Sequence, residues 1–159
     1  MPIASGDISF RLSGGASNAV PATSLGGAKS SVSAGTSLFD DTSGAESAAG
    51  DVEYRCLYVH AAVAATSAKA WIAANTPSSS TDLAIGLGTS ALNGTEQTVA
   101  NEDTAPAGVT FSAAGNLAAA IDLGAMSAGS SRALWIRRTV LAAAGAATGD
   151  GGTIRITAE

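Results

Sequence analysis

The 159-residue sequence is poor in the side chains from which most enzyme and metal sites are built. It has one cysteine, Cys56, and one histidine, His60. A single cysteine excludes an internal disulfide and a zinc site made from several cysteines. No G-x-S-x-G motif is present, so the nucleophile turn of the α/β-hydrolases is missing. We therefore predict a protein that is not an enzyme and that carries no metal and no other cofactor.

Charge is also scarce. Only 13% of the residues are charged, with a formal net charge of −5, whereas charged residues make up about 25% of a typical soluble domain. Arg137–Arg138 is the one adjacent basic pair, so nucleic acid is not expected as a partner. No stretch reaches 18 uninterrupted apolar residues, and the start, MPIASGDISF, has no apolar signal region. A membrane partner and a secretory route are therefore not expected either.

Small residues are abundant where cysteine, histidine and charged residues are scarce. Gly, Ala, Ser and Thr dominate, and alanine supplies much of the 46% hydrophobic content, while aromatics reach only 4%. The length suits one domain, residues 1–159, that buries about 70% of the surface of its unfolded chain. With few large side chains for a deep core, such a chain can form a thin β-sandwich, and it would gain stability from burying surface against partners.

Alternating apolar and polar residues recur along the chain and predict short strands. Glycine-rich segments separate them, and eight to ten strands of this kind are typical of an all-β sandwich or a jelly-roll-like fold. The clearest candidates are residues 7–12, 51–63, 67–75, 83–88, 117–123, 132–140 and 153–159, with a further short strand within 105–116.

The spacing of Cys56 and His60 raises the possibility of a catalytic pair. On a helix, side chains four residues apart are neighbours, whereas on a strand they lie about 13 Å apart, at ~3.3 Å per residue. The segment 51–63 is rich in β-branched and aromatic residues, and from Leu57 both of its faces are apolar. We predict a strand that is covered on both faces, which leaves the two side chains apart.

Two other segments contain only partial motifs. GGAKSS, at 26–31, lacks the glycines that a phosphate-binding loop needs before its lysine. The acidic run 40–53 lacks the carboxylate spacing of a calcium loop, so we interpret it as a solvated acidic turn.

The segment 13–50 is long and contains few large apolar residues. Loops of this length in compact domains are usually functional or disordered. We interpret it as an extended N-terminal arm that runs across neighbouring subunits and is mobile in the free protein, with a floppy loop as the alternative. Its expected apolar anchors in an interface are Val20, Leu25, Val32, Leu38 and Phe39.

Three further residues are candidates for a subunit contact. Trp71 and Trp135 are large and of a type enriched at interfaces, and we expect at least one of them at a sheet edge or a subunit contact. Arg137 shares a strand face with Trp135, and it could stack on that ring, pair with an acidic neighbour or remain solvated.

Several stretches together resemble a family of small structural proteins of tailed bacteriophages. They are DISFRLSGGASN, SLGGAKSS, LFDDTSGAESAAGDVEYRCLYVH, LAIGLG and the ending RALWIRRTV…GDGGTIRITAE. The resemblance is strongest to head decoration (cement) proteins, and it implies a β-sandwich or jelly-roll module on the capsid exterior, commonly a homotrimer. The implied partners are the major capsid protein and further copies of the chain itself. The implied location is the virion, after synthesis in the bacterial host cytoplasm.

Two alternatives remain open. The chain could be a tail, neck or baseplate structural protein of the same kind of virus. It could also be a carbohydrate-binding module on a sandwich scaffold, although its seven Trp, Tyr and Phe residues are few for exposed sugar platforms.

Overall fold

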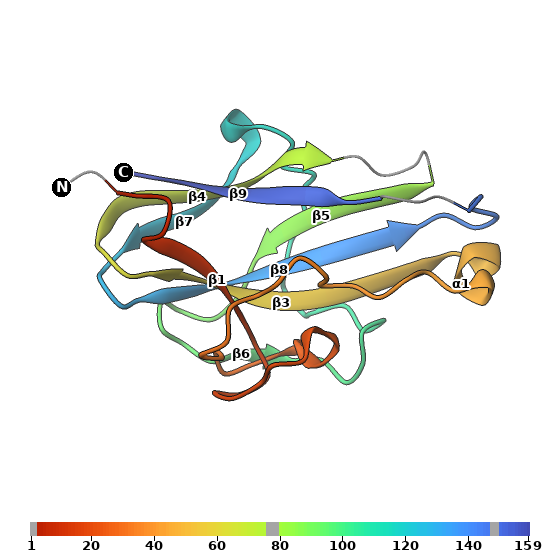
Figure 1. Cartoon of the computed structure of the whole chain (residues 1–159), viewed down its shortest axis with the longest axis horizontal. Helices are drawn as coiled ribbons and strands as arrows, with labels where there is room; N and C mark the ends of the chain where they lie inside the picture. The colour runs from red at the N-terminus through yellow and green to blue at the C-terminus, as the bar shows by residue number, and fades with distance from the viewer. Residues whose placement is uncertain (1–2, 76–79, 147–149) are drawn as a thin grey trace.

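The computed structural model describes residues 3–75, 80–146 and 150–159. In these residues it contains nine strands, one α-helix and two short 3₁₀ turns (Figure 1). The strands are β1 (Ile8–Leu12), β2 (Gly26–Gly27), β3 (Asp51–Ala61), β4 (Ala65–Asn75), β5 (Thr81–Leu87), β6 (Glu96–Thr98), β7 (Ile121–Met126), β8 (Ser131–Val140) and β9 (Gly152–Ala158). The helix α1 is Gly44–Ala49, and the 3₁₀ turns are η1 (Pro21–Thr23) and η2 (Leu117–Ala119).

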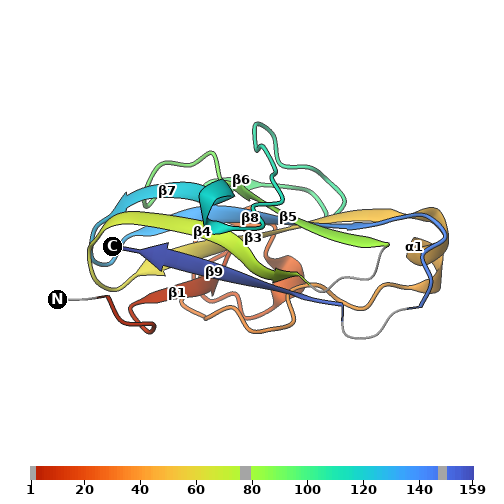
Figure 2. The ribbon, with the colours of Figure 1, turned by 90° about the horizontal axis from the view of Figure 1, so that it is seen from above.

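Two antiparallel sheets face each other. The four-stranded sheet has the order β1-β3-β8-β5, and the three-stranded sheet has the order β7-β4-β9. Figure 1 shows β4 and β9 above β8 and β3, and in Figure 2, seen from above, the two sheets overlap. The chain is therefore all-β, as its alternating pattern predicted, and the jelly-roll assignment stays a prediction.

The main core lies between the two sheets. Leu57 and Val59 of β3 pack there with Leu134 and Ile136 of β8. Three of the six buried side chains that the three-stranded sheet contributes to this layer are alanines: the six are Ala65, Ala68, Ala70, Ile72, Leu123 and Met126. Alanine therefore provides half of the buried side chains on this side of the core.

A third layer covers the outer face of the four-stranded sheet. Cys56, Tyr58 and Trp135 on that face are fully buried under loops that include the small β2–β6 sheet. Gly26 allows the loop to approach closely: its φ is +96°, and a Cβ there would lie 1.8 Å from the Gln97 carbonyl oxygen. Both faces of β3 are thus covered, as predicted.

The segment 13–50 is folded onto its own chain. The Leu12 amide donates to the Val32 carbonyl at 3.0 Å, and the Ala34 amide donates to the Phe10 carbonyl at 2.9 Å. The backbone near residues 30–34 therefore runs along the free side of β1 and pairs with it. This corrects the expectation of an arm that leaves the body of the protein, because β1 offered the segment an unpaired edge within the same chain.

The acidic run also contains a helix that we did not predict. In α1 the Ser43 side chain accepts from the Glu46 amide, while the Glu46 carboxylate accepts from the Ser43 amide. This reciprocal arrangement is a capping box, which satisfies two backbone donors at the helix start. Its S-x-x-E signature is visible in the sequence, but six residues are too few for a recognisable helical stripe.

The strand predictions differ from the structure in two places. The predicted strand 117–123 begins with η2, and its strand part, β7, extends to Met126. The strand expected within 105–116 is reduced to an isolated bridge between Ser112 and Ile85. This bridge pairs with β5 at the edge of its sheet.

Candidate interaction surface

Cys56 and His60 have separate surroundings. The Cys56 side chain is fully buried, and this burial raises the pKa of its thiol. The His60 Nδ1 atom lies 3.0 Å from the Ser131 hydroxyl and 3.3 Å from the Lys29 amine. Burial and the nearby Lys29 lower the pKa of His60. Both residues follow the strand geometry of β3 and have structural partners, so they do not form a catalytic pair.

A buried ion-pair network lies at one end of the sandwich. Glu53 and Arg138 face each other in the β3–β8 register and form an ion pair, and Arg55 forms another with Glu102. Burial raises the pKa of the Glu53 carboxyl to about 7, although Arg138 and Arg55 favour its ionised form. The sequence does not reveal this network, because the alternation at 51–55 shows which side chains share a face but not which charged side chains of distant segments meet them there.

The same network contains three acidic groups close enough to suggest a metal site. One oxygen from each of Asp40, Glu53 and Glu102 lies within 4.8 Å of the others. Two guanidinium groups, those of Arg55 and Arg138, already form ion pairs with these three carboxylates. We therefore interpret the cluster as an ion-pair network rather than a cation site.

The network also holds the segment 13–50 in place. The guanidinium carbons of Arg55 and Arg138 lie 5.3 and 4.9 Å from the centre of the Phe39 ring. Arg138 also donates to the Asp40 carbonyl at 2.6 Å. Cation–π contacts of this kind are worth about 0.5–2 kcal/mol each. The buried charges thus anchor residues 39–40 against β3 and β8.

A second buried acid, Glu96, organises a loop of the third layer. Its carboxylate accepts from the amides of Thr89 and Ser90 at 3.2 and 2.8 Å. Burial alone would raise the pKa of Glu96, but these hydrogen bonds outweigh burial and lower it to about 2. Its own amide donates to the Tyr58 hydroxyl at 2.9 Å. Glu96 is therefore a structural acid that ties the loop 89–96 to β3.

A partly accessible tryptophan lies on the outer face of the three-stranded sheet. Trp71 on β4 is half-buried there, and the indole N–H donates to the Thr157 hydroxyl at 3.1 Å. The Arg155 guanidinium carbon lies 5.7 Å from the centre of the same ring. We call this surface the Trp71 face, made of Lys69, Trp71, Asp122, Arg155 and Thr157, which the strand register places together.

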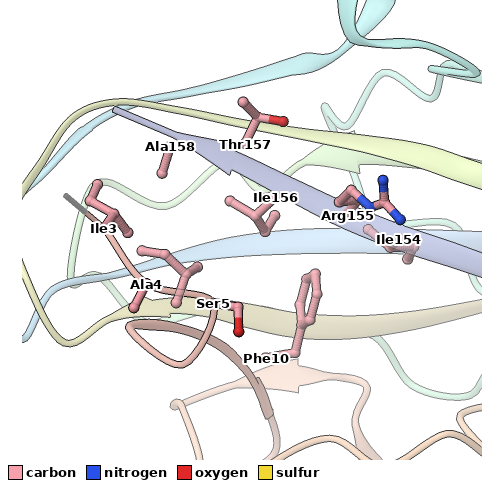
Figure 3. Close-up of a pocket in the computed structure, with 10 residues that line it drawn as sticks. Ile3, Ala4, Ser5, Phe10, Ile154, Arg155, Ile156, Thr157 and Ala158 are labelled. Atoms are coloured by element: carbon pink, nitrogen blue, oxygen red, sulfur yellow. The ribbon is translucent and has the colours of Figure 1, made fainter.

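An apolar groove borders the Trp71 face along β9. It has a volume of about 520 Å³ and lies between β9 on one side and β1 with the preceding residues on the other (Figure 3). We call it the β9 groove; its lining residues are Ile3, Ala4, Ser5, Ile8, Phe10, Ile154, Arg155, Ile156, Thr157 and Ala158. The alternation at 153–159 predicted the strand, but not that one of its sides would remain open.

The five predicted apolar anchors of the segment 13–50 fall into three groups. Leu25 packs against the cluster on the outer face of the four-stranded sheet, and Val32, Leu38 and Phe39 pack against the main core. These four are used within the chain, which corrects the expectation that they are free to enter a neighbour. Val20 remains accessible, with 52% of its surface exposed.

The two tryptophans differ clearly in how exposed their side chains are. Trp135 is 0% exposed, because the third layer covers its side of β8, so it does not lie at an interface. Arg137 follows it on the same face, and its guanidinium carbon lies 5.3 Å from the centre of the Phe111 ring rather than over Trp135. Trp71 is thus the tryptophan that can contact a partner.

Comparison of the chain with protein-family models, curated proteins and solved structures found no match. Among the described residues, no helix has both the length and the apolar character needed to cross a membrane. The class that the structure defines is an all-β protein with two facing antiparallel sheets.

Proposed function

We propose that the chain is a non-enzymatic virion structural protein of a tailed bacteriophage, which binds the capsid exterior and stabilises it by bridging neighbouring capsid subunits. The proposal begins with the sequence resemblance to head decoration proteins. The structural observation that supports it is the Trp71 face, where a partly exposed indole lies beside Arg155 on a rigid sheet. Trp and Arg are the residue types that most often carry binding energy at protein interfaces.

The buried polar groups are consistent with a binding role. Arg55 and Arg138 form ion pairs with Glu53 and with further carboxylates, and they anchor residues 39–40. The Glu96 carboxylate accepts hydrogen bonds from the loop 89–96. These ionisable side chains are therefore engaged in holding the third layer and the segment 13–50 in place. A rigid scaffold of this kind suits a protein that contributes a fixed surface to a larger assembly.

The proposed partners are the major capsid protein and further copies of the chain, with a trimer as the favoured assembly. We place the bound protein on the capsid exterior, after its synthesis in the host cytoplasm. Tail, neck or baseplate attachment is the alternative position in the particle.

The test is a copy-number and location measurement on purified phage particles, followed by binding of the purified protein to particles that lack it. We expect a copy number that matches the capsid lattice, and binding to isolated heads. The variant Trp71→Ala should weaken that binding strongly, whereas Leu141→Ala should not, because Leu141 is also exposed but lies outside the Trp71 face. A few copies per particle, found with isolated tails, would overturn the capsid proposal in favour of the tail alternative.

A second candidate function is carbohydrate binding, and the same indole favours it. A half-buried tryptophan beside polar side chains such as Asp122 can provide a stacking platform for a sugar ring. A glycan array separates the two candidates: Trp71-dependent binding to a defined glycan supports the carbohydrate module and argues against the capsid proposal.

A further inference from the structure

The two facing sheets differ in width, and the three-stranded sheet has two edge strands, β7 and β9, of which β9 borders the apolar groove. The sheet that contains β9 has three strands, while the opposite sheet has four. The four-stranded sheet has covered edges, because residues 30–34 pair with β1 and Ser112 pairs with Ile85 of β5. In the part of the chain that the structure describes, β9 pairs with β4 on one side and with no strand on the other.

The hydrogen-bond pattern shows which backbone groups face the open side. Ser67 and Glu159 exchange backbone hydrogen bonds, at 3.3 and 2.9 Å. In an antiparallel pair, successive residues of a strand turn their backbone groups alternately toward and away from the neighbouring strand. With Glu159 turned toward β4, the N–H and C=O groups of Ile154, Ile156 and Ala158 point away from it. They form a regular row of donors and acceptors along the open edge.

The β9 groove lies directly beside this row. Ile154 and Ile156 form one wall, and Phe10 of β1 forms part of the opposite wall (Figure 3). Ile8 of β1 also lines the groove. An added strand would extend the three-stranded sheet and place every second side chain in this apolar space. Because β1 and residues 3–5 lie opposite, the space suits a single extended strand rather than the edge of a second folded sandwich.

The charge at the edge defines the chemistry of the incoming strand. Among the described residues that line the β9 groove, Arg155 is the charged one. On the outer face of the sheet it lies between Thr153 and Thr157 in the alternation of β9, beside Trp71. A residue directly opposite Arg155 on an added strand would lie within reach of its guanidinium, and opposite charges at such positions stabilise strand pairing.

We propose that the open edge of β9 binds an extended segment of a partner protein by strand addition. The segment pairs antiparallel to β9, as all strands of this protein pair. Its inward side chains are apolar and fill the groove, and an acidic side chain on its outer face pairs with Arg155. Strand addition of this kind takes affinity from main-chain hydrogen bonds and specificity from alternate side chains. The inference does not depend on whether the partner is a capsid protein.

The test uses the purified full chain and an acetylated, amidated hexapeptide, Thr-Val-Asp-Val-Thr-Val. Binding is followed by indole fluorescence and by amide chemical shifts. We expect saturable binding that shifts the amides of Ile154, Ile156 and Ala158 and changes the signal of Trp71. A peptide with Lys in place of Asp should bind about tenfold more weakly, because it places a positive charge opposite Arg155.

Two sets of controls make the test specific for strand addition. N-methylation of the first two valine amides should abolish binding, because these amides face β9, whereas N-methylation of the Asp and second Thr amides should leave it nearly unchanged. In the protein, Arg155→Glu should reverse the preference between the Asp and Lys peptides. Lys69→Glu, on the same outer face but on the central strand β4, should leave that preference in place.

Three results would overturn the inference. They are no binding at peptide concentrations up to about 1 mM, shifts at sites away from β9, or equal effects of the two N-methylation patterns. A failure here leaves the capsid proposal intact, because that proposal is tested on particles through the Trp71 face.

Discussion

Glu53 and Arg138 lie directly opposite each other on β3 and β8, and the buried Glu53 carboxylate forms an ion pair with the Arg138 guanidinium. Arg55 lies near the same carboxylate, 4.0 Å from Nη2 to Oε1. The pair therefore belongs to a network in which each buried charge depends on another. Removing Glu53 costs more than the pair itself contributes, because Arg55 and Arg138 then keep only their ion pairs with the more exposed carboxylates of Glu102 and Asp40.

Glu53→Ala should consequently destabilise the protein by about 3–5 kcal/mol, measured as the free energy of unfolding in urea. Asp40→Ala is the matched control. The Asp40 side chain belongs to the same network but is 70% exposed, so its loss should cost less than about 1 kcal/mol. Equal effects of the two substitutions would show that the network is not buried.

Phe39→Ala should loosen the segment 13–50 without unfolding the sandwich. The Phe39 ring contacts both guanidinium groups, so its removal leaves residues 39–40 with the contacts of Arg138 to Asp40 as their remaining tie to the network. Hydrogen exchange is the appropriate measurement. We expect faster exchange of the Ala34 amide, which donates to β1, while the amides of Leu57 and Leu134 keep their protection.

Unchanged exchange of Ala34 in that variant would show that the hydrogen bonds to β1 hold the segment by themselves. In the wild-type protein, strong protection of Leu12 and Ala34 is expected, because both amides are hydrogen-bonded between β1 and residues 30–34. Rapid exchange of both would restore the original expectation of an arm that is mobile in the free protein.

Glu96 gives the protein a defined acid sensitivity. Its pKa in the folded protein is about 2, below the ordinary value of 4.5. A carboxyl group whose pKa is lowered by folding stabilises the folded state above pH 4.5, and this contribution is lost as the pH falls from about 4.5 toward 2. The stability difference between wild type and Glu96→Gln should therefore be largest above pH 5 and shrink through that window.

The quantity to measure is the difference in the free energy of unfolding between wild type and Glu96→Gln, because titration of Glu53 changes the stability of both proteins in the opposite sense. Its pKa is raised to about 7, so its titration removes stability as the pH rises from about 4.5 to 7. This effect is present in both proteins and cancels in the difference. A difference that does not vary between pH 2 and pH 5 would argue against the lowered pKa of Glu96.

Trp135 offers a test of packing against hydrogen bonding. Its indole is fully buried, and the N–H has no hydrogen-bond partner among the described residues. Trp135→Ala should cost about 3–5 kcal/mol through the cavity it leaves. Trp135→Phe should cost clearly less, because it retains much of the packing and removes the unpaired donor. Similar losses in thermal unfolding for both variants would show that the N–H is satisfied.

The sequence predicted the sheets well where packing follows a simple period. The alternation at 132–140 and at 51–63 identified the two long central strands, which the structure forms as β8 and β3. It also predicted that β3 is covered on both faces. It could not show which part of the chain supplies that cover, because Leu25 and Val99 reach the outer face of the sheet from distant loops.

The candidate site was predictable only in part. Trp71 was correctly placed in a strand, but nothing local distinguishes it from Trp135, which is also flanked by apolar residues in a strand. Their different exposure depends on the third layer, which covers one sheet and not the other. In the same way, Leu38 and Phe39 resemble the anchors of an exposed arm until the buried guanidinium groups of Arg55 and Arg138 are placed beside them.

The alanine-lined wall of the core has a consequence for how the protein responds to temperature. Unfolding raises the heat capacity in proportion to the apolar surface that it exposes. Ala65, Ala68 and Ala70 expose little surface compared with the leucines and isoleucines that usually occupy such positions. The heat-capacity change per residue should therefore be small and the stability curve correspondingly flat, so that the free energy of unfolding changes little between the cold and the upper physiological range.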